Sequence, residues 1–340
     1  MKAQEALQAI KEKPLAPLYL ILGTESYLQN RIKQAFMERL QLEKDDLDFV
    51  YFDLEQDPLN LVVAEAQTPS LFSIEDKRLI IAENPLFLTA EKKSNVIEQD
   101  LTDFLTYLAA PAESGVVVII APYEKLDERK KVSKLLKKQA TIIDVQPLKE
   151  QEVQRYVRQT FESAQIQLER SAFETFMQLT EMDLTKAMQE VKKLLLYGAT
   201  GAPLTKEIIL QLVPQSLENN IFELTENVLA GNADKALRIY DDLHLQGEET
   251  IKINAILIGQ VRLLLQTKIL MKAGYQQANI AQTLKVHPYR VKLAMQQAKK
   301  YAEKQLMVLF DELVENDYLV KTGQMDKEFL FQLFVLKTAK

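Results

Sequence analysis

The sequence predicts a parallel α/β domain followed by two helical domains. Short, continuous apolar runs alternate with longer helix-capable stretches up to about residue 147, which is typical of strands buried in a parallel sheet. Beyond Pro147 this strand patterning disappears, and the chain reads as helices to residue 340. Of the 340 residues, 47% are hydrophobic and 26% are charged, so there is enough apolar material for two or three domains.

The first domain, residues 1–147, is expected to be doubly wound. Its strand candidates are 18–22, 49–54, 79–82, 116–121 and 142–145. The stretches between them, such as 27–40 and 96–109, have the length of helices that connect parallel strands by right-handed crossovers. This domain has the outline of a nucleotide-hydrolysing domain.

A phosphate loop of the form G-x-x-x-x-G-K-[ST] would be expected between the first strand and the following helix. When this template is placed on Gly23, Leu28, Gln29 and Asn30 occupy the positions that require Gly, Lys and Ser or Thr. No lysine would then meet the phosphates, and the backbone amides could not form the same cradle. We interpret Gly23 instead as a tight turn from strand to helix.

The third strand supports the same interpretation. The Asp-Glu pair that would bind magnesium after this strand is replaced by Ala82 and Glu83. We therefore expect no intrinsic catalysis and no cofactor. An active nucleotide hydrolase with an unusual loop stays as a competing hypothesis, which ATP binding by the isolated protein would support.

The segment 67–72, Gln-Thr-Pro-Ser-Leu-Phe, places two bulky apolar residues beside a proline, between an expected helix and an expected strand. Such junctions usually lie at the surface. A partner pocket that buried both Leu71 and Phe72 would gain roughly 3 to 6 kcal/mol from apolar burial, which is enough to anchor an interface. The alternative is that the pair folds back under the next helix as part of the core.

Residues 124–138 follow the fourth strand and predict a basic amphipathic helix. Arg129, Lys130, Lys134 and Lys137 are the candidates for a surface that faces DNA phosphates. Charge runs of this kind are usually solvated helix faces, and no aromatic residues interleave with these cations. Both interpretations stay open.

Two helical domains are expected in the rest of the chain. Residues 148–213 predict a small bundle, and prolines and polar residues between 203 and 220 indicate a second boundary before residues 214–340. In the last domain, apolar residues occupy most of the circumference of the helix expected over 251–273. Such a helix needs neighbours on more than one side, from its own bundle or from other subunits.

Residues 279–297 imitate a helix-turn-helix, with Pro288 in the first turn of the second helix. A DNA-binding regulator that uses this segment is therefore the alternative function. Against it, Arg290, Lys292, Gln296 and Gln297 are the few side chains that the first turns offer to DNA. His287 is interpreted as a capping or packing residue.

Composition removes several classes of function. With no cysteine and two histidines, disulfides, thiol nucleophiles and zinc sites are not expected, and we predict no metal site. The formal net charge of −6 argues against a surface that binds nucleic acid everywhere. We find no run of 18 apolar residues and no signal peptide, and we expect a cytoplasmic protein with no membrane partner.

Several segments resemble the delta subunit of the bacterial DNA polymerase III clamp loader. They are 17–23 with Glu25 and 27–28, and, more specifically, 218–224, 260–266 and 286–292. The resemblance extends over essentially the whole chain. It implies an ATPase-like, AAA+-type domain without a functional phosphate loop, a small helical lid domain and a helical collar domain that serves oligomerisation.

The resemblance also implies a use for the exposed apolar pair. The family's clamp-binding element carries a Gln that two residues separate from a Ser-Leu-Phe or similar tripeptide, and Gln67, Ser70, Leu71 and Phe72 match it. Leu71 and Phe72 would then insert into a pocket of the sliding clamp, the beta subunit. The implied function is to hold this ring open for loading onto primed DNA during replication.

The implied partners are the other clamp-loader subunits, delta prime and tau or gamma, in a hetero-pentamer. Those neighbouring subunits would hydrolyse ATP for the DNA polymerase III holoenzyme. Because the formal net charge of this chain is −6, it stays open whether the subunit itself contacts the primed DNA.

Overall fold

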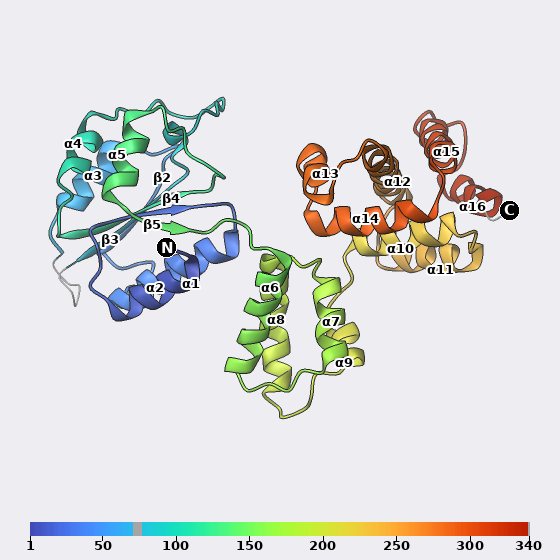
Figure 1. The fold of residues 1–340 in the computed structure, drawn as a ribbon, viewed down its shortest axis with the longest axis horizontal. Coiled ribbons are helices and arrows are strands. Elements are labelled where there is room, and N and C mark those ends of the chain that lie inside the picture. Colours follow the sequence, from blue (N-terminus) through green and yellow to red (C-terminus); the bar gives the residue numbers. More distant parts are fainter. Residues whose placement is uncertain (71–76, 339–340) are drawn as a thin grey trace. The chain divides into compact units, whose positions relative to one another are not determined.

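The computed structural model describes residues 1–70 and 77–338. Contacts between residues divide the chain into two compact units, Met1–Val153 and Gln154–Lys340 (Figure 1). The first unit is the α/β domain that the sequence predicts, and the second is helical, so the predicted fold class is confirmed. The division of the helical part near residue 213 stays a prediction.

A parallel sheet forms the centre of the first unit. Its strands in the described residues are β1 (Leu18–Leu22), β2 (Phe49–Asp53), β3 (Arg78–Glu83), β4 (Gly115–Ala121) and β5 (Thr141–Asp144). Their order across the sheet is β2-β3-β4-β1-β5, with every pair parallel. Each strand lies within one or two residues of its predicted range.

Helices cover both faces of this sheet. They are α1 (Ala3–Glu12), α2 (Ser26–Leu40), α3 (Leu59–Gln67), the 3-10 helix η1 (Leu86–Leu88), α4 (Thr102–Ala109) and α5 (Lys131–Gln139). Leu18 and Leu20 of β1 belong to the core that the sheet forms with α3, α4 and α5. Tyr19, which points to the opposite face, packs edge-on against Phe36 of α2 with ring centroids 4.8 Å apart. Both faces of β1 are therefore buried, as its continuous apolar run predicts.

Two predicted helices of the first unit are shorter in the structure. The helix expected over 96–109 begins at Thr102, and the one expected over 124–138 begins at Lys131. Before Lys131 the chain forms turns instead, because Asp127 accepts hydrogen bonds from the backbone and side chain of Arg129. The backbone N–H of Asp127 donates to the carbonyl oxygen of Leu88 at 2.8 Å. Side-chain hydrogen bonds to neighbouring backbone groups compete with helix in this way.

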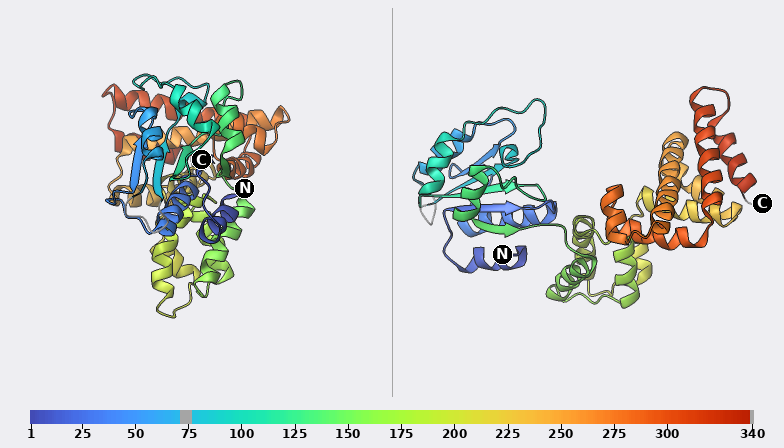
Figure 2. Two further views of the ribbon diagram at one scale, coloured as in Figure 1. Left: turned by 90° about the vertical axis from the view of Figure 1, so that its left-hand side faces the viewer. Right: turned by 45° about the horizontal axis from the view of Figure 1, so that its top comes forward.

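The second unit is built from helices. After α6 (Glu150–Ser163), they are α7 (Arg170–Leu179), α8 (Leu184–Gly198), α9 (Lys206–Leu212), α10 (Leu217–Leu229), α11 (Ala233–Leu245), α12 (Thr250–Lys272), α13 (Gln277–Leu284), α14 (Pro288–Lys300), α15 (Glu303–Lys321) and α16 (Lys327–Thr338). Helices α10 to α16, coloured yellow to red, form one bundle (Figures 1 and 2).

Helix α12 lies in the core of this bundle. It contacts α10, α14, α15 and α16, and Ile253, Leu257, Val261 and Leu264 are fully buried. Among the described residues, α12 is also the helix whose length and composition would let it cross a membrane. Packing on several sides accounts for the same apolar surface, and the prediction that this helix needs several neighbours is confirmed.

Helices α13 and α14 form the predicted helix-turn-helix shape. Lys285 ends α13 in the left-handed conformation, and Pro288 opens α14. The Nδ1 atom of His287 accepts a hydrogen bond from the backbone N–H of Tyr289 at 3.3 Å, so His287 caps α14 as the sequence interpretation expected.

Candidate functional site

The predicted clamp-binding element begins where α3 ends. Gln67 is the last residue of α3 and is exposed, and Ser70 is partly buried three residues later. Leu71 and Phe72 lie outside the described residues. The structure therefore places the first two of the four predicted contact residues, at the end of the sheet where β3 begins.

A polar network surrounds Ser70. Its hydroxyl donates a hydrogen bond to Oδ2 of Asp48 at 2.8 Å, and Asp48 is 5% exposed. The guanidinium of Arg78 lies between two carboxylates, with Nε 3.7 Å from Oδ1 of Asp48 and Nη1 2.8 Å from Oε2 of Glu65. Its Nη2 donates to the carbonyl oxygen of Leu47 at 2.8 Å. A buried carboxylate is stable in such a setting because it is paired and hydrogen-bonded.

This network fixes the described residues on both sides of the element. Ser70 follows α3, and Arg78 is the first residue of β3. Beside it, the ammonium group of Lys77 donates to the carbonyl oxygen of Leu15 at 3.0 Å. The backbone N–H of Leu79 donates to the carbonyl oxygen of Asp48 at 2.8 Å. Ser70 and Arg78, the described residues that flank the element, are therefore both anchored to the sheet.

The opposite end of the sheet, where a phosphate loop would lie, is closed by a tight turn at Gly23. Its φ is +140°, and a Cβ atom there would lie 2.2 Å from the carbonyl carbon of Val145. The side-chain amide of Gln29 donates to the carbonyl oxygen of Gly23 at 2.6 Å. Gly23 is thus required by the close approach of two backbones, which confirms its interpretation as a tight turn.

An acidic cleft of about 800 Å³ opens beside this turn, at the carboxyl ends of the strands. Its charged lining residues are the carboxylates Glu55, Glu91, Glu124, Asp127 and Glu128 and the cations Lys93, Lys125 and Arg129. Lys93 pairs with Glu55, and Arg129 pairs with Asp127 at 2.9 Å. The excess of carboxylates disfavours a triphosphate at this end of the sheet.

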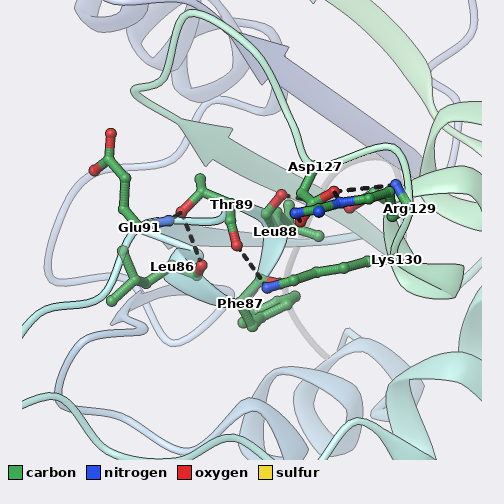
Figure 3. A network of polar contacts seen from close by, with 9 residues as sticks. Leu86, Phe87, Leu88, Thr89, Glu91, Asp127, Arg129 and Lys130 are labelled. Atoms are coloured by element: carbon green, nitrogen blue, oxygen red, sulfur yellow. Dashed lines mark hydrogen bonds and ion pairs between the residues drawn. The ribbon is translucent and has the colours of Figure 1, made fainter.

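The wall of the acidic cleft is organised by side chains of the segment before α5 (Figure 3). Two hydrogen bonds of 2.9 Å join the guanidinium of Arg129 to the carboxylate of Asp127. These bonds lower the pKa of Asp127 to about 2. The ammonium group of Lys130 donates to the carbonyl oxygens of Phe87 and Thr89, which ties the start of α5 to the loop after β3.

These contacts involve three of the four residues predicted to face DNA. Besides the two just described, Lys137 pairs with Glu128 at 2.6 Å. Lys134 is exposed on α5. A role of the four cations in DNA contact stays a prediction, and three of them already have partners in their own domain.

Within the described residues, no group of three or more His, Asp or Glu side chains could hold a metal ion. Sequence reasoning missed the network of Asp48 and Arg78 because its members lie 30 residues apart along the chain and carry no local motif. A carboxylate directly before a predicted strand was the one available signal.

Comparisons with known proteins give a consistent result. Residues 19–146 match the family model described as DNA polymerase III, delta subunit, and residues 218–338 match the model described as DNA polymerase III delta subunit, C-terminal domain. DNA polymerase III subunit delta of Bacillus subtilis is 38% identical over 337 residues, which cover 98% of this chain and 96% of the relative.

A probable DNA polymerase III subunit delta of Aquifex aeolicus is 24% identical over 266 residues, which cover 77% of this chain and 73% of the relative. The solved structure of the Bacillus subtilis DNA clamp loader delta protein is similar with a TM-score of 0.78 and 37% identity, and the match covers 99% of both chains. The similarity therefore includes both units of this chain.

Proposed function

Because this chain belongs to the DNA polymerase III delta subunit family, we propose that it binds the sliding clamp through Leu71 and Phe72 and holds the ring open for loading onto primed DNA. The observation that carries this proposal is the anchoring of Ser70 directly before the apolar pair. An interface gains affinity when the residues that position its anchors are already ordered. Buried Asp48 and its partly buried partner Arg78 provide that order.

Ring opening would follow from differential affinity. A ligand shifts an equilibrium between closed and open rings by the difference in its binding to the two states. The apolar pair would supply the anchor, and a second contact near residues 70 and 77–78 would favour the opened ring. Lys77 and Arg78 are the described cations at this position.

We further propose that this subunit hydrolyses no nucleotide and that neighbouring subunits hydrolyse ATP for the complex. The closed turn at Gly23 and the acidic cleft beside it support this proposal. The chain would then act as the stationary part of a complex in the cytoplasm, and it would need no cofactor of its own.

The bundle of α10 to α16 is proposed to join this chain to delta prime and tau or gamma subunits in a hetero-pentamer. The support is a set of exposed apolar side chains on its last two helices. They are Met307, Val308, Val314 and Tyr318 of α15 and Phe329 and Leu336 of α16. Tyr318 is 61% exposed, which is a large apolar surface to leave in water.

The test of clamp binding is mixing with the purified clamp on a sizing column. We expect the wild-type chain to co-elute with the clamp and the Leu71→Ser, Phe72→Ser double variant to elute alone, with nearly unchanged thermal unfolding. Leu245→Ser is the matched control, because Leu245 is 86% exposed elsewhere in the chain. Unfolding of the double variant would assign the pair to the core, and co-elution of the double variant would remove the proposed contact.

The helix-turn-helix shape of α13 and α14 supports a second candidate, a DNA-binding regulator. Its second helix, however, has Arg290 and Lys292 only partly exposed in its first turns. A duplex-reading helix needs such side chains free to reach base edges. Salt-dependent, sequence-specific binding of duplex DNA in a gel-shift series would favour this candidate, and a flat series would remove it.

A further inference from the structure

A basic cleft of about 690 Å³ lies between α6, α7 and α14 in the second unit. Arg158 of α6, Arg170 of α7 and Lys292 of α14 line it, so each helix contributes one cation. Glu174 is the one carboxylate among its described lining residues, and its Oε1 lies 2.9 Å from Nε of Arg170. The lining therefore carries a net charge of about +2, in a chain whose formal net charge is −6.

Aromatic rings support two of these cations. The guanidinium of Arg158 lies 4.3 Å from the ring centroid of Phe173, and Nζ of Lys292 lies 5.9 Å from that of Tyr289. Both rings are buried, whereas Arg158 remains exposed. A guanidinium stacked on a ring still presents its N–H groups around its edge, so Arg158 can donate into the cleft while its position is fixed.

Neutral donors complete the lining. Gln154, Gln178 and Gln296, one from each of the same three helices, contribute side-chain amides. Converging cations repel one another unless an anion lies among them, so the arrangement gains most from a ligand with several negative groups. Arg, Lys and Gln are side chains that contact the phosphates of nucleic acids.

We propose that this basic cleft binds the phosphodiester backbone of a single nucleic-acid strand. Because the buried rings of Phe173 and Tyr289 offer no open face for stacking, recognition depends on phosphates and is independent of base sequence. A concave cleft between helices suits a strand better than the convex surface of a duplex. The inference deepens the proposed function by assigning a direct contact with the single-stranded part of primed DNA to this subunit.

The test uses the full chain and a fluorescein-labelled oligothymidylate, with affinity measured by anisotropy over a series of salt concentrations. Each lost phosphate contact lowers the slope of log affinity against log salt by about 0.7. We expect Arg158→Gln, Arg170→Gln, Lys292→Gln to lower this slope by about 2 and to weaken binding at low salt roughly tenfold or more. Arg170→Lys should keep the slope of the wild-type chain, because it keeps the charge.

The matched control replaces Lys192, Lys206 and Lys304, three exposed cations of the same unit outside the cleft, by Gln. We expect its slope to change much less than that of the triple cleft variant. The single variant Lys292→Gln, with thermal unfolding compared to the wild type, separates loss of contact from loss of fold.

Equal slopes for the cleft variant and the control variant would overturn the proposal. Equally strong capture of a polyglutamate probe by the same three cations would overturn it as well and indicate an acidic protein partner. Tighter binding of a duplex than of the single strand would overturn the assignment to a strand. Clamp binding is measured separately. The Leu71→Ser, Phe72→Ser variant keeps the basic cleft, so it can lose clamp binding and still bind the oligothymidylate.

Discussion

The hydroxyl of Tyr107 is a buried polar group without a hydrogen-bond partner among residues 1–70 and 77–338. Tyr107 is 3% exposed on α4, where its ring stacks against Phe104 with centroids 6.4 Å apart. The ring contributes to the core under the sheet, whereas the hydroxyl loses its contacts with water and gains none from the described part of the chain. Removing an unsatisfied buried group while keeping its shape is neutral or stabilising.

We therefore expect Tyr107→Phe to leave the free energy of unfolding unchanged or to raise it by about 1 kcal/mol at neutral pH. Burial raises the pKa of Tyr107 from 10.0 to about 12. Between these pH values the unfolded chain ionises while the folded chain stays protonated, so the wild-type stability falls as pH rises. Relative to that of Tyr107→Phe, the free energy of unfolding of the wild-type chain should fall by about 1.4 kcal/mol per pH unit between pH 10 and pH 12. Below pH 10, the difference in the free energy of unfolding between the two proteins should not change with pH.

Urea unfolding of both proteins at a series of pH values measures this difference. Tyr107→Phe is the control for the wild-type chain, because the two proteins share every other ionisable group. A constant difference up to pH 12, or a variant that is less stable by more than about 1 kcal/mol at neutral pH, would show that the hydroxyl has a partner in solution.

The polar network around Asp48 connects the start of β2, the end of α3 and the start of β3. Asp48 precedes β2, Ser70 follows α3, and Arg78 opens β3. The parallel strands β2 and β3 are adjacent in the sheet, so the contacts hold together the end of the sheet at which both strands begin. The stability of this edge and the positioning of Ser70 should therefore depend on one carboxylate.

We expect Asp48→Asn to lower the free energy of unfolding by about 1 to 3 kcal/mol, because a hydrogen-bonded, buried charge is lost opposite Arg78. Asp317→Asn is the control, because Asp317 pairs with an exposed lysine, Lys321, four residues along α15. That change should cost no more than about 0.5 kcal/mol. If both variants lose the same stability in urea unfolding, the network does not stabilise the edge of the sheet.

The sequence predicted elements well where the apolar residues formed a continuous run or a long helical pattern. All five described strands and the apolar helix α12 appear as expected. In β1, β3 and β4, burial on two faces accounts for the continuous apolar run. The start of α5 was wrong by several residues. There, Asp127 and Lys130 bond to backbone groups of a distant loop, and those partners come together only after folding.

The candidate site could be predicted only where its residues are neighbours in the sequence. A run such as Gln-Thr-Pro-Ser-Leu-Phe is local and can be read from the sequence. The network behind Ser70 combines residues from three segments, and the basic cleft combines Arg158 with Lys292, which lie more than 130 positions apart. Such groups depend on tertiary packing, for which a single sequence gives no periodic signal.

The two units of the molecule divide the proposed roles between them. The first unit has a parallel sheet covered by helices, with a tight turn at Gly23 and an acidic cleft beside it, and we propose that it hydrolyses no nucleotide. The second unit carries the exposed apolar helices and the basic cleft. A fold of this kind can transmit contacts between partners without a chemical step of its own.

The last prediction concerns the whole chain and ATP. Equilibrium dialysis with magnesium and ATP should detect no binding, and ATP should not raise the melting temperature. A ligand at 100 times its Kd would stabilise the native chain by about 2.7 kcal/mol, so even moderate affinity would be visible in thermal unfolding. Sodium sulfate at matched ionic strength controls for general salt effects. A rise in melting temperature that depends on ATP and exceeds this control would mean that the acidic cleft admits a triphosphate, and the chain would then be a motor subunit.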